Sequence, residues 1–320
     1  IRDRFSLKEL TKALRKSHNT APGPDKIHYE FLKHLPMSCL QILLDMFNQL
    51  WENGKYPSCW NVATVIPIPK PGKDSKVSTN YRPIALTSCI CKTMERMINE
   101  RLVWYLESNK LLTIYQSGFR KQRSTIDHLV RLESFIRQAF VRGEHNVAIF
   151  FDLEKAYDTT WKYGIMKDLH DFGLRGHLPM FIEHFLDDRT FNVRVGSTLS
   201  DTFDQECGVP QGSILSVTLF SIKINSIVKC LRQNTDASLY VDDFQICYSS
   251  QNMNTIERNL QLCLNKLQTW AEENGFKFSA AKTVCVHFCR KKLLHLDHEL
   301  TLNGAPIPVK TRDKISGPYI

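Results

Sequence analysis

The stretch Ser238-Leu239-Tyr240-Val241-Asp242-Asp243-Phe244-Gln245-Ile246-Cys247-Tyr248 decides the fold. Apolar residues on both sides of an acidic pair predict two short strands with Asp242 and Asp243 at the turn. Two like charges about 4 Å apart repel by ~4 kcal/mol at an effective dielectric of 20. A cation would offset that repulsion, so the pair favours a metal site. The alternative is an ordinary polar turn, because Asp is common in turns.

A third carboxylate, Asp152, follows the continuous apolar run Val147–Phe151, which is typical of a buried strand. Enzymes that transfer nucleotidyl groups hold two divalent ions, one at the attacking 3′-hydroxyl and one at the leaving pyrophosphate. Hard ions such as Mg²⁺ take carboxylate oxygens as ligands. Asp152, Asp242 and Asp243 form a suitable set if folding brings the strand end and the hairpin tip together.

The composition favours a polyanion as partner. Lys and Arg outnumber Asp and Glu by 42 to 33, a net charge of +9, and nucleic acid is the commonest polyanion, although many soluble proteins are basic. A hydrophobic content of 42% over 320 residues is enough for a sizeable core. No apolar run approaches the ~18 residues of a membrane span. The chain begins at Ile1 rather than Met, so we expect a fragment of a longer protein.

The ten cysteines are irregularly spaced and include no CxxC pair, as expected in a reducing compartment where Cys serves as a small core residue. Cys285, His287 and Cys289 alternate on a predicted strand and would share one face. Two interpretations stay open for them. One is buried strand packing; the other is a zinc site, for which the fourth ligand and the usual spacing are missing.

The segments around the acidic residues resemble the conserved blocks of reverse transcriptases. Tyr240-Val241-Asp242-Asp243 resembles the YxDD signature, and the other palm blocks follow the family's order: Phe150-Phe151-Asp152-Leu153-Glu154-Lys155-Ala156-Tyr157-Asp158, Gly208-Val209-Pro210-Gln211-Gly212-Ser213, and Gly275-Phe276-Lys277-Phe278 with Lys282-Thr283. Upstream blocks resemble the fingers of non-long-terminal-repeat retrotransposons of the jockey-like group: residues 21–25, 68–72, 80–84 and 116–120. The resemblance covers about residues 5–309, and the order of the blocks makes it strongly specific.

This resemblance implies an α/β (α+β) chain with the fingers and palm of a right-hand polymerase. The palm would be an antiparallel sheet packed on helices, and the thumb would be missing. We expect fingers and an N-terminal extension in residues 1–146, the palm in residues 147–309, and a divergent, truncated tail in residues 310–320. In that tail, Lys314-Ile315-Ser316-Gly317-Pro318 departs from the family's primer-gripping hairpin, since Pro cannot donate to a sheet ladder.

The resemblance also implies roles for single residues. Asp152, Asp242 and Asp243 would bind two Mg²⁺ ions, with Mn²⁺ as a substitute, and Lys282 would protonate the pyrophosphate. The alternative for Lys282 is a solvated lysine at a strand edge. Tyr157 would be the steric gate against a ribose 2′-hydroxyl, or else simple aromatic packing.

Contacts with the nucleotide and the nucleic acid follow in the same way. Residues expected to contact the incoming nucleotide or template are Lys70, Arg82, Gln211 and Gly212. A planar guanidinium suits a triphosphate, and Gly is needed where backbone approaches a ligand closely; the alternatives are a surface charge for Arg82 and a helix-entry turn capped by Ser213. Residues expected to follow a nucleic-acid backbone are Arg120, Lys121 and Arg123, or else these form a solvated loop.

The expected function is RNA-directed DNA polymerase activity, with an RNA template, a DNA primer and dNTPs as partners. An endonuclease and other domains of a parent polyprotein are implied, and so is work in the nucleus. One alternative is an inactive, nucleic-acid-binding remnant of such an element. Another is an RNA-directed RNA polymerase, against which the gate at Tyr157 argues.

Overall fold

The computed structural model describes residues 2–290 and 299–310, which pack as two compact units. The first unit comprises Ile1–Leu111 and Trp161–Phe220, and the second comprises Leu112–Thr160 and Ser221–Ile320. The boundary expected between fingers and palm at residues 146 and 147 stays a prediction. The expected divergent tail from residue 311 onward lies outside the described residues.

The first unit is largely helical. Its helices are α1 (Leu7–Arg15), α2 (Tyr29–Lys33), α3 (Met37–Glu52), α4 (Cys89–Ser108), α7 (Lys162–Asp171) and α8 (His177–Leu186), with short 3-10 helices η1 (Ser58–Trp60) and η2 (Ser78–Asn80). The helix α9 (Ile214–Ile224) begins in this unit. Ser6 and Glu9 form a capping box at the start of α1, which satisfies backbone N–H groups there. Trp51 of α3 is fully buried and packs on Phe5 and Phe181.

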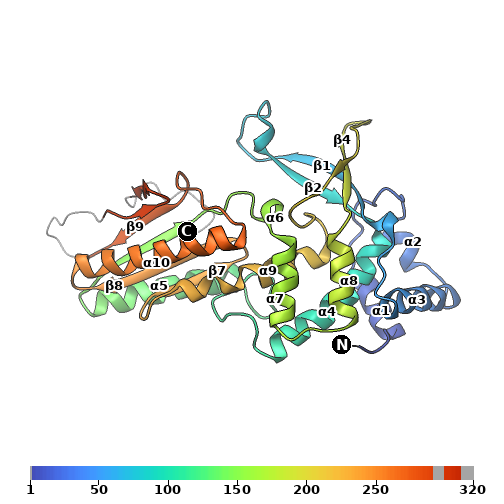
Figure 1. Ribbon diagram of the computed structural model, residues 1–320, viewed down its shortest axis with the longest axis horizontal. Helices are drawn as coiled ribbons and strands as arrows, with labels where there is room; N and C mark the ends of the chain where they lie inside the picture. The colour runs from blue at the N-terminus through green and yellow to red at the C-terminus, as the bar shows by residue number, and fades with distance from the viewer. Residues whose placement is uncertain (1, 291–298, 311–320) are drawn as a thin grey trace. The chain divides into compact units, whose positions relative to one another are not determined.

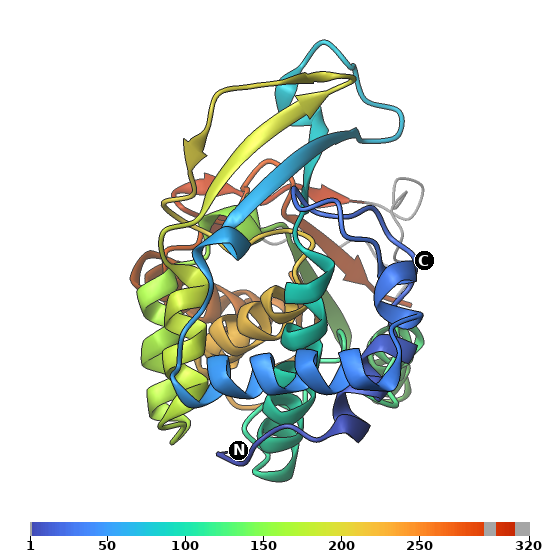
Figure 2. The same cartoon turned by 90° about the vertical axis from the view of Figure 1, so that its right-hand side faces the viewer.

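The sheet of the first unit consists of β1 (Val62–Pro69), β2 (Tyr81–Leu86), β4 (Thr190–Val195), β5 (Thr198–Leu199) and β6 (Phe203–Asp204). Its order is β2-β1-β4-β5, and β6 also pairs with β4. Figure 2 shows β1 between β2 and β4. The β1–β4 pairing ends at Val65, so Pro67 faces only Pro83 of β2. Neither proline has an N–H to donate, and this two-stranded end of the sheet tolerates them.

The second unit is a sheet with helices along it. Its strands are β3 (His145–Phe151), β7 (Asp236–Tyr240), β8 (Asp243–Ser250), β9 (Val284–Phe288) and β12 (Val309–Lys310), in the order β12-β9-β3-β8-β7. Its helices are α5 (Thr125–Val141), α6 (Ala156–Thr159) and α10 (Met253–Asn274), with η3 (Asn225–Cys230). A separate hairpin joins β10 (Thr301–Leu302) to β11 (Ala305–Pro306).

This sheet is antiparallel except where β12 pairs with β9 in parallel. Both β8 and β9 run antiparallel to β3, and α10 connects them (Figure 1). The helices α5 and α10 each contact β3, so the middle of that strand is fully enclosed, with Val147, Ala148 and Ile149 at 0% exposure. The predicted antiparallel palm sheet packed on helices is confirmed.

Among the described residues, no helix combines the length and the apolar character that crossing a membrane requires.

Candidate active site

The register of β3 and β8 brings the predicted acidic residues to one edge of the sheet. Phe151 pairs with Phe244, so Asp152 comes directly after that rung on one strand and Asp243 directly before it on the other. Side chains alternate along a strand. The aromatic rings therefore lie on one face, where Phe151 contacts Phe244 and Phe278 at centroid distances of 5.3 and 5.1 Å. The neighbouring carboxylates project from the other face.

The turn between β7 and β8 is strained. Tyr240 pairs with Asp243, which leaves Val241 and Asp242 as a two-residue turn. Val241 has φ +62°, and Asp242 is not among the residues with positive φ. A positive φ at the first central residue alone is the type II′ pattern, in which that position normally holds Gly. A β-branched residue there costs about 1–3 kcal/mol, so the surrounding structure must hold it in place.

Gln116 supplies that support. Its Oε1 accepts hydrogen bonds from the backbone N–H of Val241 at 3.1 Å and of Gly118 at 2.8 Å. Its Nε2 donates to the Val241 carbonyl at 3.4 Å. Gly118 lies so close that a Cβ there would be 2.6 Å from the Val241 nitrogen. The sequence offered the block 116–120 as a resemblance only and assigned no role to Gln116 or Gly118.

Ser279 and Thr283, which lie on either side of Lys282, form hydrogen bonds with the backbone of Asp152. The Asp152 carbonyl accepts from Ser279 N–H at 2.8 Å, and the Asp152 N–H donates to Thr283 Oγ1 at 3.5 Å. These contacts place Lys282 Nζ 3.1 Å from Asp152 Oδ2. Both side chains are well exposed, at 69% and 39%, so the ion pair itself contributes little stability. The sequence analysis did not single out Ser279, and it quoted the fully buried Thr283 only as part of a block that resembles the family, without a role.

The pKa shifts of Asp242 and Tyr157 show which charged groups lie near each of them. Burial, and then the charge of Asp152, raise the pKa of the Asp242 carboxyl. Burial, and then the charge of Asp242, raise the pKa of the Tyr157 hydroxyl above its usual range. The Tyr157 hydroxyl therefore stays protonated at neutral pH. The structure thus brings together Asp152, Asp242, Asp243, Tyr157 and Lys282.

This donor set fits a divalent cation. Its potential ligands are carboxylate oxygens, the donors that hard ions prefer. Asp242 carries the cost of burying a charge beside a second negative charge, and a cation would remove that cost. The Lys282 ammonium on Asp152 shows that this carboxylate already attracts positive charge.

Lys70 and Arg82 belong to the first unit, where Lys70 directly follows β1 and Arg82 lies in β2. Arg82 is exposed and lies opposite Ile68 in the ladder. Lys70 is half-buried, and its Nζ donates to the Thr79 carbonyl at 3.0 Å. Arg82 is therefore placed on the open surface of the hairpin, as contact with a bound anion requires.

Gln211 and Gly212 lie against the backbone of β2. The Gln211 carbonyl accepts from Ala85 N–H at 2.7 Å. Gly212 has φ +130°, and a Cβ there would be 2.3 Å from the Ala85 carbonyl oxygen. Glycine is thus needed here for a close approach to the chain's own backbone.

The helix behind that loop is capped by a residue that the sequence did not reveal. The Glu95 carboxylate accepts from the N–H groups of Ile214 and Leu215 at 2.8 and 3.3 Å and from the Ser213 hydroxyl. Glu95 is only 1% exposed. A buried carboxylate at a helix N-terminus is stabilised by the free N–H groups and the helix dipole. Ser213 therefore donates to the cap rather than forming it alone. The position 95 lay within an ordinary helical pattern and gave no local signal.

The basic loop of the second unit holds Arg120, Lys121 and Arg123, and its two arginines donate hydrogen bonds to nearby backbone carbonyls. Arg120 Nη1 donates to the Thr113 carbonyl at 2.7 Å, and Arg123 Nη1 donates to the Ile114 carbonyl at 2.8 Å. Lys121 and Arg123 are exposed, whereas Arg120 is half-buried. Arg120 thus shapes the loop that follows Gln116, and the proposed contacts of all three residues with nucleic acid stay predictions.

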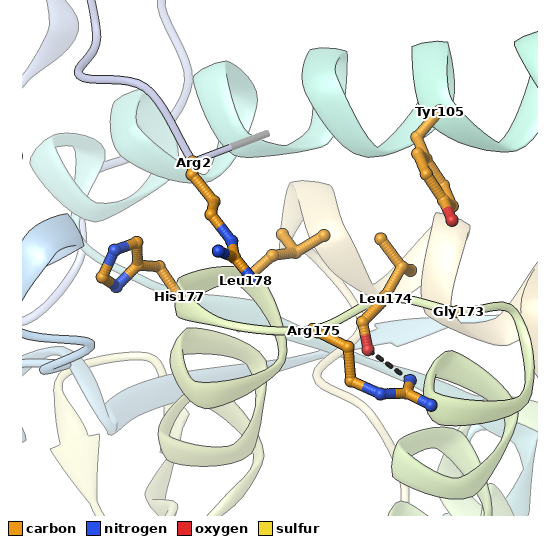
Figure 3. Close-up of a pocket in the computed structure, with 7 residues that line it drawn as sticks. All are labelled: Arg2, Tyr105, Gly173, Leu174, Arg175, His177 and Leu178. Atoms are coloured by element: carbon orange, nitrogen blue, oxygen red, sulfur yellow. Dashed lines mark hydrogen bonds between the residues drawn. The ribbon is translucent and has the colours of Figure 1, made fainter.

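A small pocket of about 190 Å³ in the first unit is unrelated to the carboxylates. Figure 3 shows that Arg2, Arg175 and His177 contribute to its lining, and that Arg175 turns back to the Leu174 carbonyl. No carboxylate lines the pocket, so it offers no carboxylate ligand for a hard metal ion.

Comparisons with known proteins relate the sequence of this chain to one family. Residues 68–311 match the sequence model of a family described as "Reverse transcriptase (RNA-dependent DNA polymerase)". The chain is 30% identical over 303 residues to the probable RNA-directed DNA polymerase from transposon BS of Drosophila melanogaster, covering 93% of this chain and 33% of that protein. It is 30% identical over 277 residues to the polymerase from mobile element jockey of the same fly, covering 85% and 30%. The chain thus spans about a third of the length of these relatives.

Solved structures support the fold. An apo telomerase from Candida tropicalis, truncated from its C-terminal domain, has a TM-score of 0.55 at 15% identity, covering 82% of this chain and 58% of that one. A telomerase from Candida tropicalis in complex with a fragment of telomeric RNA has a TM-score of 0.53 at 16% identity, covering 88% and 49%. The predicted α/β fold of polymerase fingers and palm is therefore confirmed.

Proposed function

Because the chain belongs to the reverse transcriptase (RNA-dependent DNA polymerase) family, we propose that it extends a DNA primer on an RNA template for a retrotransposon of the jockey-like group. The observation that supports this best is the β3–β8 register, which sets Asp152 beside the turn that carries Asp242 and Asp243. A polymerase needs such a convergence of carboxylates, whereas an ordinary polar hairpin does not.

Asp152, Asp242 and Asp243 would hold two Mg²⁺ ions, with Mn²⁺ able to replace them. When bound, the metal would activate the primer 3′-hydroxyl and offset the charge of the phosphates. The chain's own groups then orient and discriminate. Lys282, 3.1 Å from Asp152, would give a proton to the departing pyrophosphate. Gln116 keeps the acidic turn in shape before any ligand arrives.

Tyr157 would exclude ribonucleotides. Its electrostatic link to Asp242 supports a position near the sugar of a nucleotide whose phosphates meet the carboxylates. The roles of Lys70, Arg82, Gln211 and Gly212 in nucleotide contact, and of Arg120, Lys121 and Arg123 in backbone contact, are part of the proposal. So are the fingers in residues 1–146, the palm in residues 147–309, work in the nucleus, and an endonuclease elsewhere in the parent polyprotein.

A primer-extension assay tests the proposal. The purified chain would receive poly(A) template, oligo(dT) primer, Mg²⁺ and dTTP, alongside the variants Asp242→Asn and Asp171→Asn. Asp171 is an exposed carboxyl at the end of α7 and serves as the matched control. We expect extension by the wild type and by Asp171→Asn, and none by Asp242→Asn.

Binding of the primer–template without extension, at high protein concentration and with either Mg²⁺ or Mn²⁺, would instead identify an inactive nucleic-acid-binding remnant. Extension with ribonucleotides in preference to deoxynucleotides would support an RNA-directed RNA polymerase.

A further inference from the structure

A second group of potential metal ligands lies at the opposite end of β3 from the carboxylates. His145 begins β3, whereas Asp152 follows its end. Seven residues of strand separate the two places by about 20 Å. Within the described residues, His145, His287 and Cys289 offer two ring nitrogens and one sulfur that all lie within 4.8 Å of one another.

Strand register explains why these three side chains meet. Asn146 pairs with Phe288 and Val147 pairs with His287 in the antiparallel β3–β9 ladder. Continuing that register by one residue sets His145 opposite Cys289. Alternation then puts all three side chains on one face of the sheet. The sequence pattern of Cys285, His287 and Cys289 therefore pointed to the correct face, but the third ligand comes from β3 and Cys285 is instead fully buried.

The two histidines are already close enough to bind one metal ion together. His145 Nδ1 lies 3.0 Å from His287 Nε2, so one ring donates an N–H to the lone pair of the other. His145 is only 5% exposed. Two nitrogens bound to one tetrahedral zinc ion lie about 3.3 Å apart, and a nitrogen and a sulfur about 3.6 Å apart. Small side-chain movements would thus convert the hydrogen-bonded pair into a ligand pair.

We propose that His145, His287 and Cys289 form a zinc site that is separate from the catalytic centre. Imidazole and thiolate together select zinc over the hard ions that carboxylates bind. A three-residue set leaves one tetrahedral position for water or another ligand. On binding, the proton between the histidines moves to the other nitrogen of the donating ring, so both rings coordinate as neutral imidazoles, and the thiol proton of Cys289 is released to solvent. Zinc affinity therefore falls at low pH.

The role of this site is structural. It fastens the end of β9 to the beginning of β3. The other end of β9 follows Thr283, whose hydroxyl accepts from the Asp152 N–H. Zinc therefore secures the far end of the strand pair whose near end positions Asp152, without contacting the substrate.

The test is the zinc content of the purified chain after incubation with zinc and exhaustive dialysis. We expect about one ion per wild-type chain, as one tetrahedral site holds, and loss of that ion in His287→Ala and Cys289→Ser. The matched controls, His184→Ala and Cys59→Ser, change an exposed histidine and an exposed cysteine elsewhere and should keep the ion. Cobalt in place of zinc should give a thiolate-to-metal absorption band that Cys289→Ser removes.

A second measurement covers variants that fold poorly. Zinc added to chelator-treated wild type should raise Tm by roughly 5 °C at saturating metal, whereas zinc should leave the Tm of Cys289→Ser unchanged. Wild-type chain that retains no zinc would overturn the proposal. So would a zinc content that both ligand variants share with the wild type, which would identify an adventitious ion only.

Discussion

Gln116 holds the backbone of Val241 through both atoms of its side-chain amide, at 3.1 Å from the Val241 nitrogen and 3.4 Å from its carbonyl oxygen. The contact spans 125 positions of sequence and stabilises a residue at φ +62°. Because Asp242 is the next residue, the amide of Gln116 controls where one of the proposed metal ligands points.

Replacing Gln116 with Ala should therefore impair catalysis before it unfolds the chain. The substitution leaves the N–H groups of Val241 and Gly118 without their acceptor, at about 1–3 kcal/mol for each buried group. We expect primer extension to fall by about tenfold or more at temperatures well below Tm, since ~1.4 kcal/mol corresponds to tenfold in rate. Gln138→Ala, on an exposed position of α5, is the control and should retain full extension. Equal activities of the two variants would mean that the turn holds its shape without Gln116.

Gly118→Ala tests the close approach on the other side of the same turn. A Cβ at position 118 would lie 2.6 Å from both the nitrogen and Cγ2 of Val241, and overpacking of this kind costs about 1–3 kcal/mol or more. Gly143→Ala is the comparison, because Gly143 has φ +66° with open space around it and should cost about 1 kcal/mol from backbone strain alone. Urea unfolding should show the larger loss for Gly118→Ala, accompanied by weaker primer extension. The reverse order would show that the turn can shift away from position 118.

The sequence was sufficient for the parts of the site that lie on regular strands. An apolar run ending in Asp152 and an acidic pair between apolar segments predicted both strand ends, because buried strands have a simple pattern. The residues that hold these parts of the site in place could not be predicted in this way. Gln116 and Glu95 each act on backbone groups over 100 residues away, and hydrogen bonds of this kind follow no local periodicity. The parallel pairing of β1 with β4 was likewise invisible, since Val62 pairs with Thr190 and no local pattern reveals so distant a partner.

Glu95→Gln should destabilise the start of α9. The carboxylate accepts hydrogen bonds from two backbone N–H groups and a hydroxyl, and bonds to a charged acceptor contribute about 1.5–3 kcal/mol each. The amide keeps the shape but loses the charge, so we expect a loss of about 2 kcal/mol in the free energy of unfolding. Glu133→Gln removes an exposed carboxylate that pairs with Arg137 on α5 and should cost less than about 0.5 kcal/mol. Indistinguishable urea midpoints would contradict the capping role.

Tyr157→Ala should relax the choice of sugar. Removing the ring opens the space in which a ribose 2′-hydroxyl would clash, so the preference for dTTP over UTP should fall by about tenfold or more. Tyr157→Phe keeps the ring and should keep the preference, which separates steric exclusion from any effect of the hydroxyl. The measurement compares single-nucleotide extension with each substrate. An unchanged preference in Tyr157→Ala would assign the residue to packing alone.

Asp242→Asn should stabilise the chain in the absence of metal, although it abolishes activity. Burial and the charge of Asp152 raise the pKa of Asp242 in the folded chain, so the folded state binds its proton more tightly than the unfolded state does. Stability from this group is fully present below the ordinary Asp pKa of about 4 and is lost as pH rises through the raised, folded-state value. In EDTA, the Tm of Asp242→Asn should exceed that of the wild type by about 2 °C or more at pH 7, and the difference should shrink toward pH 4.

The control is Asp201→Asn, which changes an exposed loop carboxylate and should change Tm little at either pH. Mg²⁺ should then reverse the order at pH 7, because only the wild type keeps the full set of carboxylates that gains from the ion. A wild-type chain that is the more stable of the two in EDTA at pH 7 would show that Asp242 is compensated without metal, and the electrostatic case for a cation at this turn would fail.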